Sequence, residues 1–169
     1  MQDKLKYPLE QVLEVKRDRV EKAERVVEER KRALQIEENK LKKVEKERDK
    51  VLNHHNDKLA QMRQAFDEGT TSEEILQMKR YLKVVKEQLA KEEEKVREQK
   101  KQVHQAERKL EEAKKDLHRK RIEEEKIKTH KEEWLKEAKA HIKREEAKEH
   151  DEIGQILYEG LKRKKKESE

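Results

Sequence analysis

Apolar residues recur along this sequence with a seven-residue period, and this repeat constrains the fold more than any other feature. In the second half, one track places an apolar residue at every seventh position from Ile75 to Leu117. A second track, offset by three, runs from Met78 to Trp134 with a few polar interruptions. The first half repeats the pattern from Leu9 onward. Two such tracks, flanked mostly by Glu, Lys, Arg and Gln, predict a coiled-coil seam.

The composition favours such a seam over a globular core. Charged residues make up 52% of the chain, apolar residues 30% and aromatic residues 3%, which is too little apolar material to fill a core of this length. A compact enzyme domain is therefore disfavoured. The absence of cysteine excludes disulfides and thiolate metal sites. Because the sequence has neither a signal peptide nor a long apolar run, we expect a cytoplasmic chain that does not insert into membranes.

The strongest interruption of the repeat is the stretch DEGTTSEE at 67–74. Gly69 suits the left-handed conformation that ends many helices, and Thr71 followed by Glu74 forms a capping-box pattern for the next helix. Pro8 suits the first turn of a helix. The sequence therefore predicts one coiled-coil hairpin domain over 1–169, with a helix over 8–66, a turn over 67–71, a helix over 72–163 and a basic tail over 162–169.

The polar residues of the seam indicate how the two helices pair. If the chain folds back at the turn, facing residues have numbers that sum to about 140. Arg48 then faces Glu92 and Lys16 faces Glu124, two opposite-charge matches that favour an antiparallel pairing within one chain over a parallel dimer. The expected fold is all-α, a long two-helix antiparallel coiled-coil hairpin with unequal arms, and we expect it to be a monomer.

The second predicted helix extends past the start of the first and carries an apolar stripe there. Two interpretations stay open for this stripe: a docking face for another protein, or an exposed helix weakened by Gly154 and Gly160. The register also places Trp134 beside Tyr7 and Pro8, where the indole either closes the open end of the hairpin or anchors a partner. The stripe consists of Leu135, Ala138, Ile142, Ile153, Ile156, Leu157 and Leu161.

The candidate partner-binding residues lie at the two ends of the hairpin. Near the turn, Tyr81 stands off the main seam among Lys79, Arg80 and Lys83, and it is either a contact residue or an ordinary flanking residue. Near the termini, the candidates are Tyr7, Leu9, Trp134, Leu135, Ile142, Ile153 and Leu157.

The sequence contains no pattern typical of catalysis or cofactor binding. It has no glycine-rich phosphate loop and no nucleophile with a plausible base, so we expect no catalytic, cofactor-binding or metal site and no enzymatic activity. None of the seven histidines follows a Glu by three residues, as carboxylate-bridged metal bundles require. The net charge of +6 comes from Lys and Arg interleaved with Glu, and the chain has few aromatic residues. This pattern argues against nucleic acid as a partner.

Three stretches resemble a known family. YPLEQVLEVKRDRVEKAERVV near the start, DEGTTSEEILQMKRYLKVV at the turn, and HKEEWLKEA followed by DEIGQ near the end are similar to the YscO/FliJ group of type III secretion proteins, above all the chlamydial members. The resemblance covers almost the whole chain. It implies a two-helix stalk in the cytoplasmic part of a secretion apparatus, peripheral to the inner membrane and similar in shape to the γ subunit of rotary ATP synthases.

The same resemblance implies a set of partners. They are a hexameric secretion ATPase, an inner-membrane export gate protein and, further, a needle-length regulator and substrate chaperones. The residues alone leave two alternatives open. One is a structural or adaptor coiled-coil protein with an unknown partner, and the other is a basic arm that binds nucleic acid.

Overall fold

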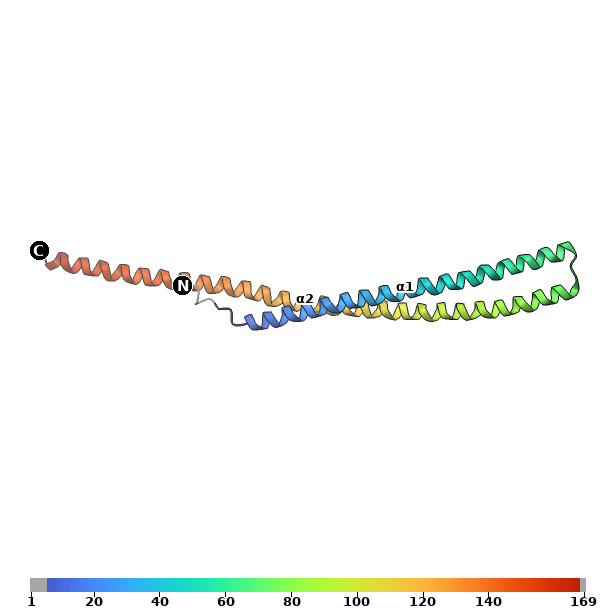
Figure 1. Cartoon of the computed structure of the whole chain (residues 1–169). Coiled ribbons are helices and arrows are strands. Elements are labelled where there is room, and N and C mark those ends of the chain that lie inside the picture. The colour runs from blue at the N-terminus through green and yellow to red at the C-terminus, as the bar shows by residue number, and fades with distance from the viewer. Residues whose placement is uncertain (1–5, 168–169) are drawn as a thin grey trace. The chain divides into compact units, whose positions relative to one another are not determined.

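The computed structural model describes the backbone of residues 6–167 and the side chains of residues 6–163. It contains two long helices, α1 over Glu10–Glu68 with 59 residues and α2 over Ser72–Glu167 with 96 residues, joined by a short turn (Figure 1). The predicted all-α, two-helix antiparallel hairpin is therefore confirmed.

The helix ends differ from the predicted ones by a few residues. α1 begins at Glu10 and not at residue 8, because Pro8 lies in a turn in which the Glu10 N–H donates to the Tyr7 carbonyl at 3.3 Å. The first bond of the helix follows, from the Leu13 N–H to the Leu9 carbonyl at 3.0 Å. α1 ends at Glu68, and α2 continues past residue 163 to Glu167.

The chain divides into two compact units, and each combines a part of α1 with a part of α2. The terminal unit consists of Met1–Glu21 and His118–Glu169, and the turn unit consists of Lys22–Leu117. A single domain over the whole chain stays a prediction.

In the terminal unit, a narrow apolar seam is flanked by ion pairs between the helices. Leu13 is 1% exposed. Lys16 Nζ lies 2.6 Å from Glu123 Oε2, and this hydrogen bond lowers the pKa of Glu123. Arg17 Nε lies 3.6 Å from Glu124 Oε1. The residue numbers of both pairs sum to about 140, which is the register expected for an antiparallel hairpin that folds back at the turn.

The ion pair predicted between Lys16 and Glu124 is displaced by one residue. Glu124 is buried in the seam, where Arg17 and Lys128 meet its carboxylate, the latter at 2.8 Å. Lys16 reaches the neighbouring carboxylate of Glu123 instead. A lysine side chain is long and flexible, so it pairs with the carboxylate that is more accessible from its own helix face.

In the turn unit, the buried residues are Ala23, Val27, Val85, Val96, Leu110 and Leu117. Gln99 crosses between the helices and donates to the Glu37 carboxylate at 2.6 Å and to the Glu37 carbonyl at 3.1 Å. The register places Arg48 opposite Glu92, and that facing stays a prediction. Their ion pairs lie on their own helices: Arg48 donates to the adjacent Asp49 at 2.7 Å, and Glu92 pairs with Lys95 at 2.7 Å.

The turn between the helices is built by its backbone and by one carboxylate. Gly69 has φ of 83°. Its N–H donates to the Phe66 carbonyl at 3.3 Å, and the Thr70 N–H donates to the Ala65 carbonyl at 3.1 Å, the two bonds of a Schellman motif. This motif leaves φ above zero at the position where glycine has no steric penalty.

A capping box begins α2. The Thr71 N–H donates to Glu74 Oε2 at 3.3 Å, and the Glu74 N–H donates to Thr71 Oγ1 at 3.4 Å, so each residue satisfies a free donor of the other. The Thr70 hydroxyl also donates to Glu74 Oε2. These bonds, first that from Thr70 and then that from the Thr71 N–H, lower the pKa of the Glu74 carboxyl. The residues singled out in the sequence, Gly69, Thr71 and Glu74, thus carry the geometry of the turn.

Candidate protein-docking surfaces

The terminal unit contains an aromatic cluster formed by Tyr7, His130 and Trp134. Tyr7 lies before α1 and is 4% exposed. Its ring centroid is 5.6 Å from that of Trp134 in an edge-on arrangement and 5.8 Å from that of His130. The Tyr7 hydroxyl lies 2.6 Å from His130 Nδ1, so the polar tip of the buried phenol has a partner. His130 and Trp134 share a helix face because they are four residues apart.

An ion pair supports the aromatic cluster. Lys131 Nζ lies 2.6 Å from Glu10 Oε2 and 5.9 Å from the centroid of the Tyr7 ring. The heptad register predicts Trp134 beside Tyr7, whereas the contacts of His130, Glu10 and Lys131 were not predicted. These contacts could have been predicted from the register. If the numbers of facing residues sum to about 140, Glu10 lies opposite residue 130 and its neighbours.

Beyond the aromatic cluster, the apolar stripe of α2 changes from half-buried to exposed. Leu135, Ala138 and Ile142 are half-buried. From Ile153 onward the side chains lie in solvent: Ile153 is 55% exposed, Ile156 69%, Leu157 63% and Leu161 69%. We call these last four residues the tail stripe. They recur at spacings of three and four, so they form one apolar helix face, and no described side chain of the unit covers it.

The other terminal candidate, Leu9, is 36% exposed at the start of α1. Tyr7 and Trp134 are therefore in contact with each other, whereas Ile153 and Leu157 stand apart on the free face of α2. Buried Tyr7 contributes to packing, and the exposed tail stripe is the part of this unit that is open to a partner.

The turn unit has a second candidate surface around Tyr81, which is 47% exposed. Its hydroxyl lies 2.9 Å from His54 Nε2, the two rings meet edge-on at 5.9 Å, and Lys58 Nζ lies 6.0 Å from the centroid of the Tyr81 ring. His54 and Lys58 were not predicted to belong to this surface. Their long separation from Tyr81 in the sequence hides a proximity that only the antiparallel pairing creates.

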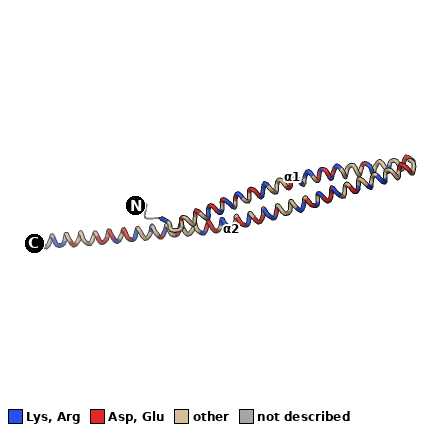
Figure 2. The backbone as a smooth tube through the Cα atoms, turned by 60° about the horizontal axis from the view of Figure 1, so that its bottom comes forward, with Lys and Arg blue, Asp and Glu red and all other residues tan. Residues whose placement is uncertain are grey.

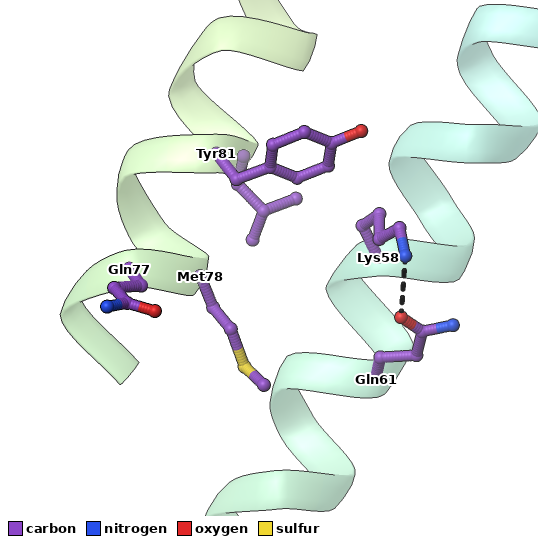
Figure 3. Close-up of a pocket in the computed structure, with 6 residues that line it drawn as sticks. Lys58, Gln61, Gln77, Met78 and Tyr81 are labelled. Atoms are coloured by element: carbon purple, nitrogen blue, oxygen red, sulfur yellow. Dashed lines mark hydrogen bonds between the residues drawn. The ribbon is translucent and has the colours of Figure 1, made fainter. Parts of the chain in front are cut away.

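Tyr81 forms one wall of an open hollow between α1 and α2, which we call the turn hollow. Figure 3 shows Met78 and Tyr81 of α2 extending toward α1, where Lys58 Nζ donates to Gln61 Oε1 at 3.0 Å. Its lining residues are Lys58, Gln61, Gln77, Met78, Tyr81 and Leu82. An aromatic ring and a methionine beside a fixed cation fit a side chain of a protein partner better than a small charged ligand.

Charges of both signs alternate along both helices (Figure 2). Most of the ion pairs are local, such as Lys31 with Glu28 and Lys101 with Glu98, three residues apart on exposed faces. Within residues 6–167, no three histidine or carboxylate side chains gather closely enough to hold a metal ion. Neither helix, as far as it is described, has an apolar stretch long enough to cross a bilayer.

The chain is similar to a known family and to solved structures. The family model for YscO-like proteins matches residues 4–166. The structure of a YscO homologue, CT670 from Chlamydia trachomatis, is 52% identical, covers 94% of this chain and 98% of its own, and superposes with a TM-score of 0.90. A chain from the structure of the Chlamydia pneumoniae CdsV and CdsO protein complex is 52% identical over 50% of this chain and 98% of its own, with a TM-score of 0.49. The chain has no match among curated proteins.

The fold and the two surfaces define the class of two-helix coiled-coil hairpin proteins. Within that class, the chain belongs to the YscO-like family, since the family model covers nearly all of its length. It is accordingly a component of a type III secretion system.

Proposed function

We propose that this protein is a non-catalytic stalk of the type III secretion apparatus, whose terminal unit engages the hexameric secretion ATPase. The observation that carries this proposal is the exposed tail stripe, an apolar helix face in the same unit as the chain's two ends. The family resemblance supplies the identity of the partner. In this proposal the protein acts in the cytoplasm, peripheral to the inner membrane.

The second contact in this proposal joins the turn unit to the inner-membrane export gate protein. The turn hollow offers the half-exposed ring of Tyr81, the thioether of Met78 and the ammonium group of Lys58 on one surface. Exposed aromatic and methionine side chains are enriched at protein interfaces. A needle-length regulator and substrate chaperones are further proposed partners, as the family resemblance implies.

The charge pattern supports protein partners over nucleic acid. Lysines and arginines stand beside glutamates along both helices (Figure 2), so phosphates would meet carboxylates wherever they met cations. A stalk inside a ring must also bind without being held in one fixed position. Weak, distributed contacts by a few apolar side chains and many exposed charges suit that task.

Removal of residues 143–169 tests the ATPase contact. We expect the shortened chain to stimulate the cognate secretion ATPase less than the full chain does. Its helix content per residue should stay nearly unchanged by circular dichroism, since residues 143–167 of α2 lie outside the aromatic cluster. A finer variant replaces Ile153, Ile156, Leu157 and Leu161 with Ser. Its matched control replaces Gly154 and Gly160 with Ala, which meets open space and removes no apolar side chain.

The turn surface is tested in the same assays. Alteration of Thr70–Ser72 together with Tyr81 should spare ATPase stimulation and impair binding to the export gate protein. Tyr81→Ala alone should weaken gate binding, whereas Val84→Ala, which removes an exposed apolar side chain outside the turn hollow, should not. If the shortened chain stimulates the ATPase fully and the turn variant does not, the proposed orientation is reversed.

A further inference from the structure

The tail stripe lies between two blocks of opposite charge. Residues 145–152, EEAKEHDE, precede it and are mainly acidic, and residues 162–166, KRKKK, follow it and are wholly basic. Every described side chain from residue 143 to residue 163 is exposed. Over residues 143–163 the end of α2 is thus exposed to solvent, and its sequence runs from an acidic block through an apolar face to a basic block.

This order is self-complementary in one orientation. The midpoint between the acidic and basic blocks falls near Ile156, and the four residues of the tail stripe are also centred there. If the α2 ends of two copies pack antiparallel and are centred on this point, their two apolar faces meet. In the same arrangement, each acidic block lies beside the basic block of the other copy. A parallel copy would place acidic on acidic and basic on basic, which is unfavourable.

The helix geometry allows a close fit in the antiparallel arrangement. Glu149, Ile153, Ile156 and Gly160 follow one another at spacings of three and four, so they share a face. Gly160 has nothing within 4 Å of the position where a Cβ would stand, so its side of the helix is open to a neighbour. Glu149 lies at the edge of the stripe, on the side that faces the basic block of an antiparallel partner.

We propose that two copies of this protein associate through their α2 ends, antiparallel, over residues 145–166. The pairing is weak and dependent on ionic strength, because charged blocks in solvent contribute much of its complementarity and salt screens them. At high protein concentration, this dimer replaces the monomer that the hairpin fold alone predicts. The seam within each chain needs no second copy, whereas the four side chains of the tail stripe are 55–69% exposed among the residues that the structure describes.

This association goes beyond the proposed stalk function and does not depend on it. It uses the same apolar face that we assign to the ATPase contact, so self-association and ATPase binding compete. Free chains would be paired at their tails, and entry into the ATPase would separate them.

Sedimentation equilibrium of the full chain, at low and high ionic strength, measures the association. One variant carries Glu145→Lys, Glu146→Lys and Glu149→Lys, and the other carries Arg163→Glu, Lys164→Glu and Lys165→Glu. Each variant alone should dimerise at least about tenfold more weakly than the native chain, because its two blocks have the same sign. An equimolar mixture of the two should recover a mixed dimer. Glu132→Lys with Lys136→Glu, a charge swap on the same helix outside the blocks, should leave association unchanged.

A crosslink locates the axis of the pair. Since the chain has no cysteine, Ile156→Cys introduces a unique thiol near the proposed axis, and mild oxidation should yield a disulfide-linked dimer. Gln155→Cys, which points away from the tail stripe, should not. Three outcomes would each overturn the proposal: a native chain that stays monomeric at several hundred micromolar, a variant mixture that does not recover association, or a monomeric chain whose tail instead binds phosphatidylglycerol vesicles.

Discussion

The rings of Tyr7 and Trp134 meet edge-on with their centroids 5.6 Å apart, which fastens the segment before α1 to α2. The phenol is 4% exposed and its hydroxyl is bonded to His130. The only tryptophan of the chain is therefore part of the terminal unit's packing, and a partner that contacts this end meets a preformed surface.

Trp134→Ala should destabilise the terminal unit by about 1–3 kcal/mol, less than the roughly 3–5 kcal/mol of a fully buried aromatic, because the indole is half-buried. Urea unfolding followed by circular dichroism measures the change. Tyr7→Phe keeps the ring contact and removes only the hydrogen bond to His130, so its cost should be smaller, about 1 kcal/mol. Equal stability of Trp134→Ala and the native chain would show that the ring contact does not fasten this segment.

A chain with Lys16→Cys and Glu123→Cys should crosslink within itself at high dilution. The two native side chains meet at 2.6 Å across the helices, so a bismaleimide that spans the usual interaxial distance of about 8–10 Å will join the thiols. Mass spectrometry distinguishes intrachain from interchain products. The control is Lys16→Cys with Glu125→Cys, whose second thiol points to another side of α2 and should react poorly. Crosslinks found only between chains would contradict the antiparallel pairing.

Gly69→Val should lower the free energy of unfolding by about 1–2 kcal/mol. The backbone at Gly69 has φ of 83°, and a Cβ there would meet nothing within 4 Å, so the cost is conformational and not a clash. Gly69→Asn should cost less, because asparagine enters the left-handed region more readily. Chemical denaturation measures both variants. An equal loss for Val and Asn would point to a cause other than the φ angle.

The contribution of Glu74 to stability should disappear in acid. Its folded pKa lies below its usual value of 4.5, first because of the hydrogen bond from Thr70 and then because of that from the Thr71 N–H. A group with a depressed folded pKa contributes stability above its unfolded pKa and loses that contribution as the pH falls through the folded one. The thermal midpoints of the native chain and Glu74→Gln should therefore differ at neutral pH and converge as the pH falls through the lowered pKa of Glu74.

Glu73→Gln is the control for this titration. Glu73 lies in the same first turn of α2 but outside the capping box, so its substitution changes the charge near the helix N-terminus without removing the cap. A pH dependence as large for Glu73→Gln as for Glu74→Gln would attribute the effect to the helix dipole and not to the hydrogen bonds of Glu74.

Much of this protein was determined by its sequence alone. The seven-residue apolar period indicates helices that each bury one narrow stripe, because so charged a chain has too little apolar surface for a globular core. The turn followed from Gly69, the one residue type that enters the left-handed conformation freely, and from the capping pattern of Thr71 with Glu74. The position of the turn then set the register, and with it the contact of Tyr7 with Trp134.

The tertiary structure decided the polar partners. Arg48 and Glu92 each have a partner on the same helix, and Lys16 bonds Glu123 instead of Glu124. A long charged side chain can reach several partners that differ little in free energy. The seven-residue apolar period therefore cannot predict which partner it bonds. The bonds of Tyr7 with His130 and of Tyr81 with His54 also appear only in three dimensions. Each of these two hydrogen bonds joins residues that are far apart in the sequence. The bonds form only because helix packing sets the directions of the side chains.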